Sequence, residues 1–292
     1  MRRTLLVLCV IFGILLVLVA LSAYAKQRQN KNVMARFAML LAKEDVTVAE
    51  VTKYIDENIA AVSKENATKL VFELERLHQT ALAQWQRRYD DMELQEKIAG
   101  VYRSGWTRAD INRLEDASLK SLLLATLDNG FKIETAEGSF FPVIDYGYYQ
   151  KYQSAVTADC VAYLEIMRLE SERMPAKDAA LMIGWEEILA RAERQEQFIK
   201  AYSSSPYLPA VQLLLQKYVS FALFGTNNTP LFSYETKRIR PEAQQVFQEF
   251  TWAEENGTLA QLIKEYLAVL AKNNYCLTGE VDRFRKQAIA AF

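Results

Sequence analysis

GFKIETAEGSFFPVIDYGYYQKY, residues Gly130–Tyr152, is the one stretch of this chain whose pattern predicts two strands around a turn. Phe131–Thr135 alternates apolar and polar side chains, as a half-buried strand does. Ala136–Gly138 suits a turn, and Ser139–Ile144 suits a return strand, in which Pro142 favours an edge or an end. We therefore expect a β-hairpin at about 131–144, packed on helices because a lone hairpin is marginally stable in water.

The sequence on either side of this hairpin has a helical pattern. Glycine (10) and proline (6) are scarce, and apolar residues recur every three or four positions. The predicted fold class is mainly α, an irregular multi-helix bundle with one small β-hairpin. Helices are expected over 32–43, 48–62, from 63 to about 85, 107–129, 157–173, 177–202, 207–224, from 241, over 258–272 and from 278 to 292.

The N-terminus predicts contact with a membrane. Arg2 and Arg3 precede an uncharged run, Thr4–Ala25, whose 22 residues would form a helix of about 33 Å, enough to cross a bilayer core. The run ends in Ala23-Tyr24-Ala25, which resembles a signal-peptidase site, so either an uncleaved anchor or a signal peptide cleaved after Ala25 fits. The expected organisation is a span over 1–25, a helical arm over 26–129 and a helical domain over 130–292 that carries the hairpin.

Charge and cysteine content limit the possible partners. Without Arg2 and Arg3 the chain has 33 basic and 36 acidic residues, a net charge of −3, which gives no electrostatic reason to bind nucleic acid. Cys160 and Cys276 could form a disulfide in an exported protein, but two thiols are the favoured interpretation because a large core needs no covalent link.

Common catalytic and metal-binding patterns are missing from the sequence. His78 is the single histidine, and it lies in a periodic helical stretch next to Leu77 without an identifiable nucleophile. No clustered Cys/His zinc pattern, EF-hand loop, Walker A motif, dinucleotide-binding glycine motif or nucleophile elbow occurs. We therefore expect no cofactor and no metal, and we favour a protein that is not an enzyme.

Carboxylates give the alternative hypothesis. Glu137 and Asp145 flank the predicted return strand, and two facing carboxylates can hydrolyse a glycosidic bond. The simpler interpretation makes Asp145 a helix N-cap and Glu187 the i,i+4 ion-pair partner of Arg191.

Two polar or aromatic clusters are candidate ligand-binding sites. Tyr146, Tyr148, Tyr149 and Tyr152 offer contact area with polar tips, suited to a sugar, a peptide or a protein, although interior packing explains them as well. The second candidate is Asn227 and Asn228, which follow the most apolar predicted helix.

For that loop, a glycine C-cap followed by a proline stop explains Gly225 and Pro230 without any ligand.

We expect a membrane-tethered, extracytoplasmic binding or scaffolding protein of the cell envelope, with a protein or envelope-polymer partner. If the span is cleaved, the body is secreted. The alternative function is an envelope glycan or peptidoglycan hydrolase that uses Asp and Glu.

Overall fold

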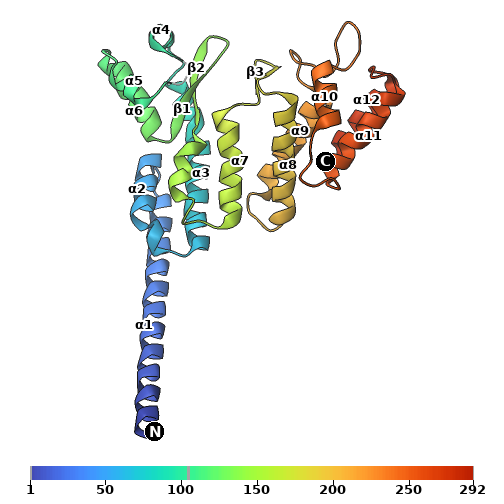
Figure 1. The fold of residues 1–292 in the computed structure, drawn as a ribbon. Coiled ribbons are helices and arrows are strands. Elements are labelled where there is room, and N and C mark those ends of the chain that lie inside the picture. The colour runs from blue at the N-terminus through green and yellow to red at the C-terminus, as the bar shows by residue number, and fades with distance from the viewer. Residues whose placement is uncertain (1, 104–105, 292) are drawn as a thin grey trace. The chain divides into compact units, whose positions relative to one another are not determined.

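The computed structural model describes the backbone at residues 2–103 and 106–291, and the side chains at 21–22, 24–103 and 106–290. The chain is mainly helical, as predicted (Figure 1). It divides into two compact units, one made of residues up to Lys132 together with Lys151–Thr157, the other of Ile133–Gln150 and Ala158–Phe292. We call these the N-terminal and C-terminal units and describe each separately.

The predicted N-terminal span falls mostly on residues whose side chains lie outside the described part of the chain. Among the described residues, no helix combines the length and the apolar character needed to cross a bilayer. The helix expected over 32–43 is the C-terminal part of the longer helix α1 (Arg2–Leu41).

The helices α2 and α3 of the N-terminal unit begin where the sequence predicts them, and each begins with a side-chain cap. Thr47 forms a capping box with Glu50 at the start of α2, and Ser63 Oγ accepts a hydrogen bond from the Asn66 N–H at the start of α3. Val33 and Phe37 of α1 are buried with the apolar stripes of the next two helices. The elements that follow α1 are α2 (Val48–Asn58), η1 (Ile59–Ala61), α3 (Lys64–Arg87), α4 (Met92–Val101), α5 (Arg108–Asn112) and α6 (Ala117–Asp128).

The helix predicted over 107–129 is in fact two helices. Thr107 and Asp110 form a capping box at the predicted start, but α5 ends at Asn112. Asp116 then caps α6, because its side chain accepts a hydrogen bond from the Leu119 N–H at 2.9 Å. A second N-cap within the apolar periodicity therefore interrupts the helix.

The predicted hairpin is present, with strands β1 (Phe131–Ala136) and β2 (Ser139–Ile144) paired in one sheet. Glu137 and Gly138 form its two-residue turn with φ values of 48° and 78°. Two successive left-handed residues are typical of a type I′ turn, whose twist matches that of the flanking strands. The next element, η2 (Tyr146–Tyr152), is a 3-10 helix, in which the Tyr148 N–H donates to the Asp145 carbonyl three residues earlier.

The C-terminal unit differs from prediction at one place. Residues 177–202 were expected to form one helix, but β3 (Ala176–Lys177) and β4 (Ala180–Leu181) form a small hairpin there, and α8 (Trp185–Ala201) begins after Gly184. Asp178 and Ala179, at φ 50° and 55°, make the turn and end the helical pattern. The other helices are α7 (Ala158–Glu172), α9 (Leu208–Phe224), α10 (Pro241–Glu249), α11 (Thr258–Lys272) and α12 (Gly279–Ala291).

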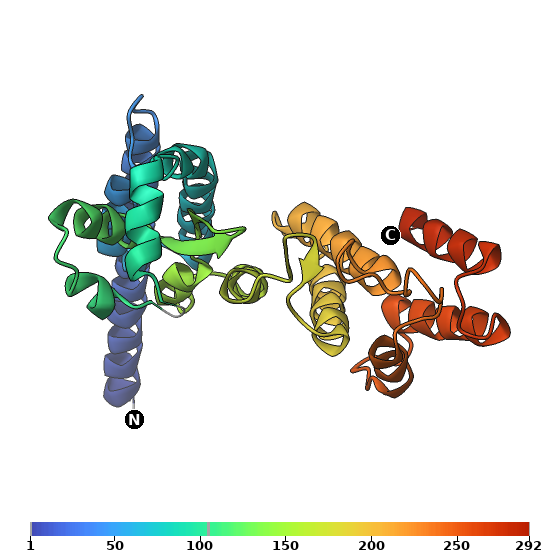
Figure 2. The ribbon, with the colours of Figure 1, turned by 90° about the horizontal axis from the view of Figure 1, so that it is seen from above.

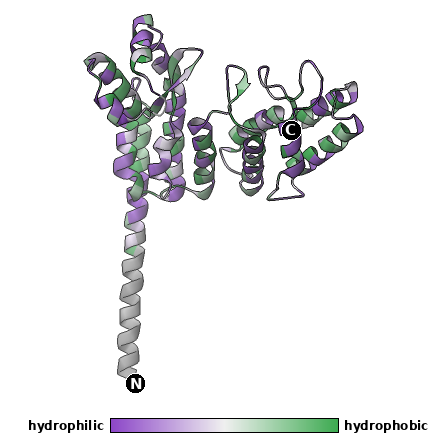
Figure 3. Cartoon of the chain, turned by 45° about the horizontal axis from the view of Figure 1, so that its top comes forward, coloured by the Kyte–Doolittle hydropathy of each residue, from purple (hydrophilic) through white to green (hydrophobic). Residues whose placement is uncertain are grey.

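Helices α8 and α9 lie side by side at the centre of the C-terminal unit (Figure 2). Leu189 of α8 and Val219 of α9 are buried in a core shared with α10 and α11. Apolar and polar residues follow different sides of the helices (Figure 3), which is the pattern that drives such packing. Leu213 of α9 is exposed, so this helix is buried along one side, although its sequence is apolar nearly all round.

Candidate functional site

Tyrosines of the 146–152 segment lie mainly in the interior. Tyr146 and Tyr149 of the C-terminal unit are buried, with ring centroids 5.6 Å apart, and Tyr148 is half-buried with its ring edge-on to Tyr149. The Tyr146 N–H donates to Ser171 Oγ at 3.2 Å. Tyr148 is therefore the one member of this group with surface to offer a ligand, and the other two contribute interior contact area.

Tyr152 belongs to the N-terminal unit and is 1% exposed. Its hydroxyl donates to Asp56 Oδ1 at 2.6 Å, and Lys151 Nζ donates to Asp56 Oδ2 at 2.8 Å. The Lys151 ammonium also lies 4.9 Å from the centre of the Tyr152 ring. Asp56 thus holds the polar tip of this tyrosine. Sequence reasoning missed Asp56 because it lies about a hundred residues away and carries no local motif.

The two candidate carboxylates lie at opposite ends of β2. Glu137 is exposed in the turn, and Asp145 follows the last residue of the strand, so about eight residues at roughly 3.3 Å each separate them. That separation exceeds the 5–10 Å that paired glycosidase carboxylates need. Asp145 Oδ1 accepts the Gly147 N–H at 2.9 Å, which is the predicted capping role.

The loop after α9 binds the small β3–β4 hairpin of the same unit. The Asn228 N–H and Nδ2 donate to the carbonyls of Ala179 and Asp178 at 2.8 and 2.6 Å. The Asn227 carbonyl accepts a hydrogen bond from the Tyr234 hydroxyl at 3.0 Å. Both asparagines are exposed, and the backbone and side-chain N–H groups of Asn228 hold the turn.

His78 is completely buried in α3, where its Nε2–H donates to the Asn129 carbonyl at 2.9 Å. Its ring meets Phe131 edge-on at 5.3 Å. Burial lowers the pKa of His78 to about 4, against the opposing effect of its backbone hydrogen bonds. The imidazole is therefore neutral at pH 7 and lies inside the core.

A cluster of polar side chains joins α7, α8 and α9 of the C-terminal unit. Arg191 donates from Nη1 to Glu170 Oε1 at 3.1 Å and to the Tyr218 hydroxyl at 3.2 Å, and it pairs with Glu187 as predicted. The Tyr218 hydroxyl in turn donates to Glu170. Burial and the Glu170 carboxylate raise the pKa of Tyr218 well above its usual range. Every polar group named here has a partner, so the cluster joins three helices.

Metal-binding and redox features are limited in the part of the chain that the structure describes. No group of three or more His, Cys, Asp or Glu side chains is placed to hold a metal ion among these residues. Cys160 and Cys276 are not joined by a disulfide; the Cys160 thiol lies buried, 3.2 Å from the Tyr207 hydroxyl.

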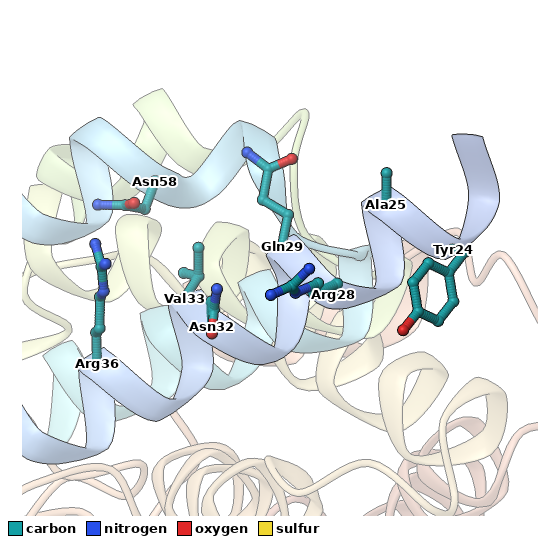
Figure 4. Close-up of a pocket in the computed structure, with 8 residues that line it drawn as sticks. All are labelled: Tyr24, Ala25, Arg28, Gln29, Asn32, Val33, Arg36 and Asn58. Atoms are coloured by element: carbon teal, nitrogen blue, oxygen red, sulfur yellow. The ribbon is translucent and has the colours of Figure 1, made fainter. Parts of the chain in front are cut away.

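Surface hollows in the described part of the chain are further candidate binding sites, and three of them are considered by their lining. One of about 410 Å³ lies along α7 and α8 and includes Glu165 and Arg194; another of about 340 Å³ lies along α11 and α12. The third, of about 450 Å³, lies on α1 and is closed on one side by Asn58 at the end of α2 (Figure 4). Its lining contains two arginines, Arg28 and Arg36, and no carboxylate.

Comparison with protein-family models, curated proteins and solved structures gave no match. The α1 hollow combines open volume with positive charge that no carboxylate of its lining balances.

Proposed function

We propose that this chain is a membrane-tethered binding or scaffolding protein of the cell envelope that acts by contact, with its helical body outside the cytoplasm. The support is that the polar residues singled out from the sequence are engaged within the protein. Asp145 accepts the Gly147 N–H, Asn228 holds the β3–β4 turn, and His78 is buried. The observation that carries the proposal is the open, cationic hollow on α1, next to the apolar run Thr4–Ala25.

The hydrolase alternative loses its leading pair of residues. Glu137 and Asp145 are separated by the length of β2, and Glu187 is engaged by Arg173 and Arg191. A contact function needs no such pair. It needs a stable scaffold with an accessible surface, and the two compact units with well-packed cores fit that requirement.

Topology is tested by labelling the full-length chain in intact cells with a membrane-impermeant maleimide. A Met92→Cys variant supplies a reporter, because Met92 is 78% exposed in α4. We expect the variant to be labelled before lysis and the parent chain, which carries the native cysteines alone, to be labelled much less. Labelling of Met92→Cys that appears only after lysis would place the body in the cytoplasm and contradict the proposal.

The mode of action is tested with isolated envelope polymer. We expect the purified chain to co-sediment with the polymer, or with a membrane-associated protein partner, without releasing soluble fragments. Release of new reducing ends over time would establish hydrolysis and contradict a contact function.

A further inference from the structure

Charge is distributed very unevenly along this chain. Residues 1–43 contain seven Lys and Arg and no Asp or Glu, whereas the rest of the chain contains 28 basic and 36 acidic residues. The first acidic residue is Glu44. The first 43 residues therefore carry a formal side-chain charge of +7, and the remainder carries −8. Such an asymmetry favours an anionic partner at the N-terminal end alone.

The hollow on α1 concentrates part of this charge in a concave site. Arg28, Asn32 and Arg36 follow an i, i+4, i+8 spacing, which places all three on the same side of the helix. Figure 4 shows Arg36 extending toward Asn58 and Arg28 lying beside Asn32. Guanidinium and amide N–H groups are the donors that bind phosphate oxygens, and arginine does so with two parallel hydrogen bonds.

Neither arginine of the hollow is neutralised by a carboxylate in the described part of the chain. Arg28 and Arg36 take part in none of its ion pairs, whereas Arg168 and Arg191 each contact two glutamates. On α2, Asp56 is engaged by Lys151 and by Tyr152. Two exposed, uncompensated arginines in one hollow supply a site for an external anion.

The hollow also begins where the apolar run ends. Arg28 lies three residues beyond Ala25, about 4.5 Å along a helix, and Arg36 lies about 16 Å beyond it. A headgroup layer is roughly 5–8 Å thick on each side of the hydrocarbon core. Arg28 therefore reaches the depth of lipid phosphates, and Arg36 reaches groups that project above them. Tyr24 lines the same hollow, at the boundary where tyrosine is enriched.

From these observations we propose that the hollow formed by Tyr24, Arg28, Gln29, Asn32, Arg36 and Asn58 binds the phosphate of an anionic lipid headgroup. This inference rests on the proposed membrane tether, because the tether brings the hollow to the headgroup layer. The recognised chemistry is the phosphate ester of the headgroup, which binds at Arg28, while Arg36 contacts polar or anionic groups of the same headgroup that project above the phosphate.

The test uses the full-length chain in a non-ionic detergent, titrated separately with short-chain phosphatidylglycerol, short-chain phosphatidylcholine and inorganic phosphate. The test variant is Arg28→Gln/Arg36→Gln. The matched control, Lys26→Gln/Lys31→Gln, removes the same charge from exposed positions of the same helix that do not line the hollow. Circular dichroism of both variants verifies that the helices are retained.

We expect the parent chain to prefer phosphatidylglycerol over phosphatidylcholine. The arginine variant should lose about tenfold or more in affinity, since a charged hydrogen bond contributes about 1.5–3 kcal/mol, and the lysine control should change much less. Equal weakening in both variants, or no preference between the two lipids, would overturn the proposed site. Inorganic phosphate that competes at the same concentration as phosphatidylglycerol would assign the site to a soluble phosphate and overturn its lipid source.

A separate experiment tests the membrane tether. Cells that express the full-length chain are fractionated, and their membranes are washed with alkaline carbonate. A chain that stays in the membrane but shows no lipid preference contradicts the hollow alone. A chain released by the wash contradicts the tether, whatever its affinity for phosphate.

Discussion

Gly225 is a residue whose identity is fixed by the backbone around it. It ends α9 at φ 71° and ψ −145°, a region that residues with a side chain rarely adopt. A Cβ placed there would lie 2.2 Å from the Thr229 carbonyl oxygen. The loop that holds the β3–β4 turn depends on this close approach of two backbone segments.

We therefore expect Gly225→Ala to lower the free energy of unfolding by about 3 kcal/mol, from overpacking and backbone strain together. The measurement is the urea unfolding midpoint, followed by circular dichroism. Gly100→Ala is the matched control, because Gly100 lies in α4, where the added Cβ would have no atom within 4 Å beyond its chain neighbours and the backbone of its own helix. It should be neutral or stabilising by up to about 1 kcal/mol. Similar losses in both variants would contradict the role assigned to Gly225.

The turn of the β1–β2 hairpin gives a pair of changes with opposite sign. Glu137 occupies a left-handed position that asparagine adopts more readily, so Glu137→Asn should raise the free energy of unfolding by roughly 0.5 kcal/mol. Gly138→Val should lower it by about 1 kcal/mol or more, since a β-branched residue is strained at φ 78°. Thermal unfolding of both variants measures this, and an unchanged Gly138→Val midpoint would argue against the type I′ turn.

His78 predicts a specific pH dependence of stability. Its pKa is about 4 in the folded chain and about 6.5 when unfolded, so below pH 6.5 the unfolded state takes up a proton that the folded state does not. The contribution of His78 is therefore complete above pH 6.5 and is lost at up to about 1.4 kcal/mol per pH unit as the pH falls toward 4.

This dependence is measured by denaturant unfolding between pH 7 and pH 4, comparing the parent chain with His78→Gln. Carboxylates that titrate in this range are common to both chains, so the difference isolates the histidine. We expect the variant to be less stable at pH 7 and to lose less stability on acidification. Parallel curves would show that His78 is not held neutral in the folded state.

Among the elements, α7, α8 and α9 are joined by the Arg191 cluster. Removing the buried cation leaves the Glu170 carboxylate, which is 12% exposed, beside the Tyr218 hydroxyl without a counter-charge. We expect Arg191→Met to lower the free energy of unfolding by about 3–5 kcal/mol, the usual effect of breaking a buried pair from one side. Urea denaturation of the full chain measures it.

Arg173→Met is the control for that prediction. Arg173 pairs with Glu187 at 2.7 Å, but its side chain is largely exposed. A surface ion pair contributes about 0–1 kcal/mol, so the control should remain close to the parent. If the two variants were equally stable, the interior cluster would not be the link between these helices.

For the whole molecule, the fate of the N-terminal run determines where the body resides. We expect the mature protein to retain the 33.5 kDa mass of residues 1–292, because the apolar run is longer than a typical signal-peptide core. Intact-mass spectrometry of protein purified from cells measures this. A product that begins at Lys26 would show cleavage after Ala25 and a secreted body, and it would remove Tyr24 from the α1 hollow.

Local chemistry made much of the secondary structure predictable. Thr47, Ser63 and Thr107 begin helices as their capping side chains predict, and Gly225 ends α9. The hairpin strands follow from period-two alternation around a turn that contains Gly138. These features depend on neighbours within a few residues, so the sequence contains the information that specifies them.

Two predicted helices were too long because a local backbone feature interrupts each of them. The stretches 107–129 and 177–202 keep an apolar periodicity of three to four, but Asp116 and the Asp178-Ala179 turn interrupt them. A short polar side chain that accepts a backbone N–H, or two left-handed residues, can end a helix without a glycine or a proline. Periodicity alone does not reveal these interruptions.

The candidate sites depended on contacts that are distant in sequence. The Tyr152 hydroxyl donates a hydrogen bond to Asp56, and Asn228 donates to the Asp178–Ala179 turn. Arg28 lines a hollow that Asn58 closes on one side. Side-chain type predicted helices, a hairpin and an apolar N-terminal run, because those follow from local hydrogen bonding and hydrophobic periodicity. Which polar groups are engaged and which stay open to a ligand followed from packing, because burial and pairing are properties of segments brought together by folding.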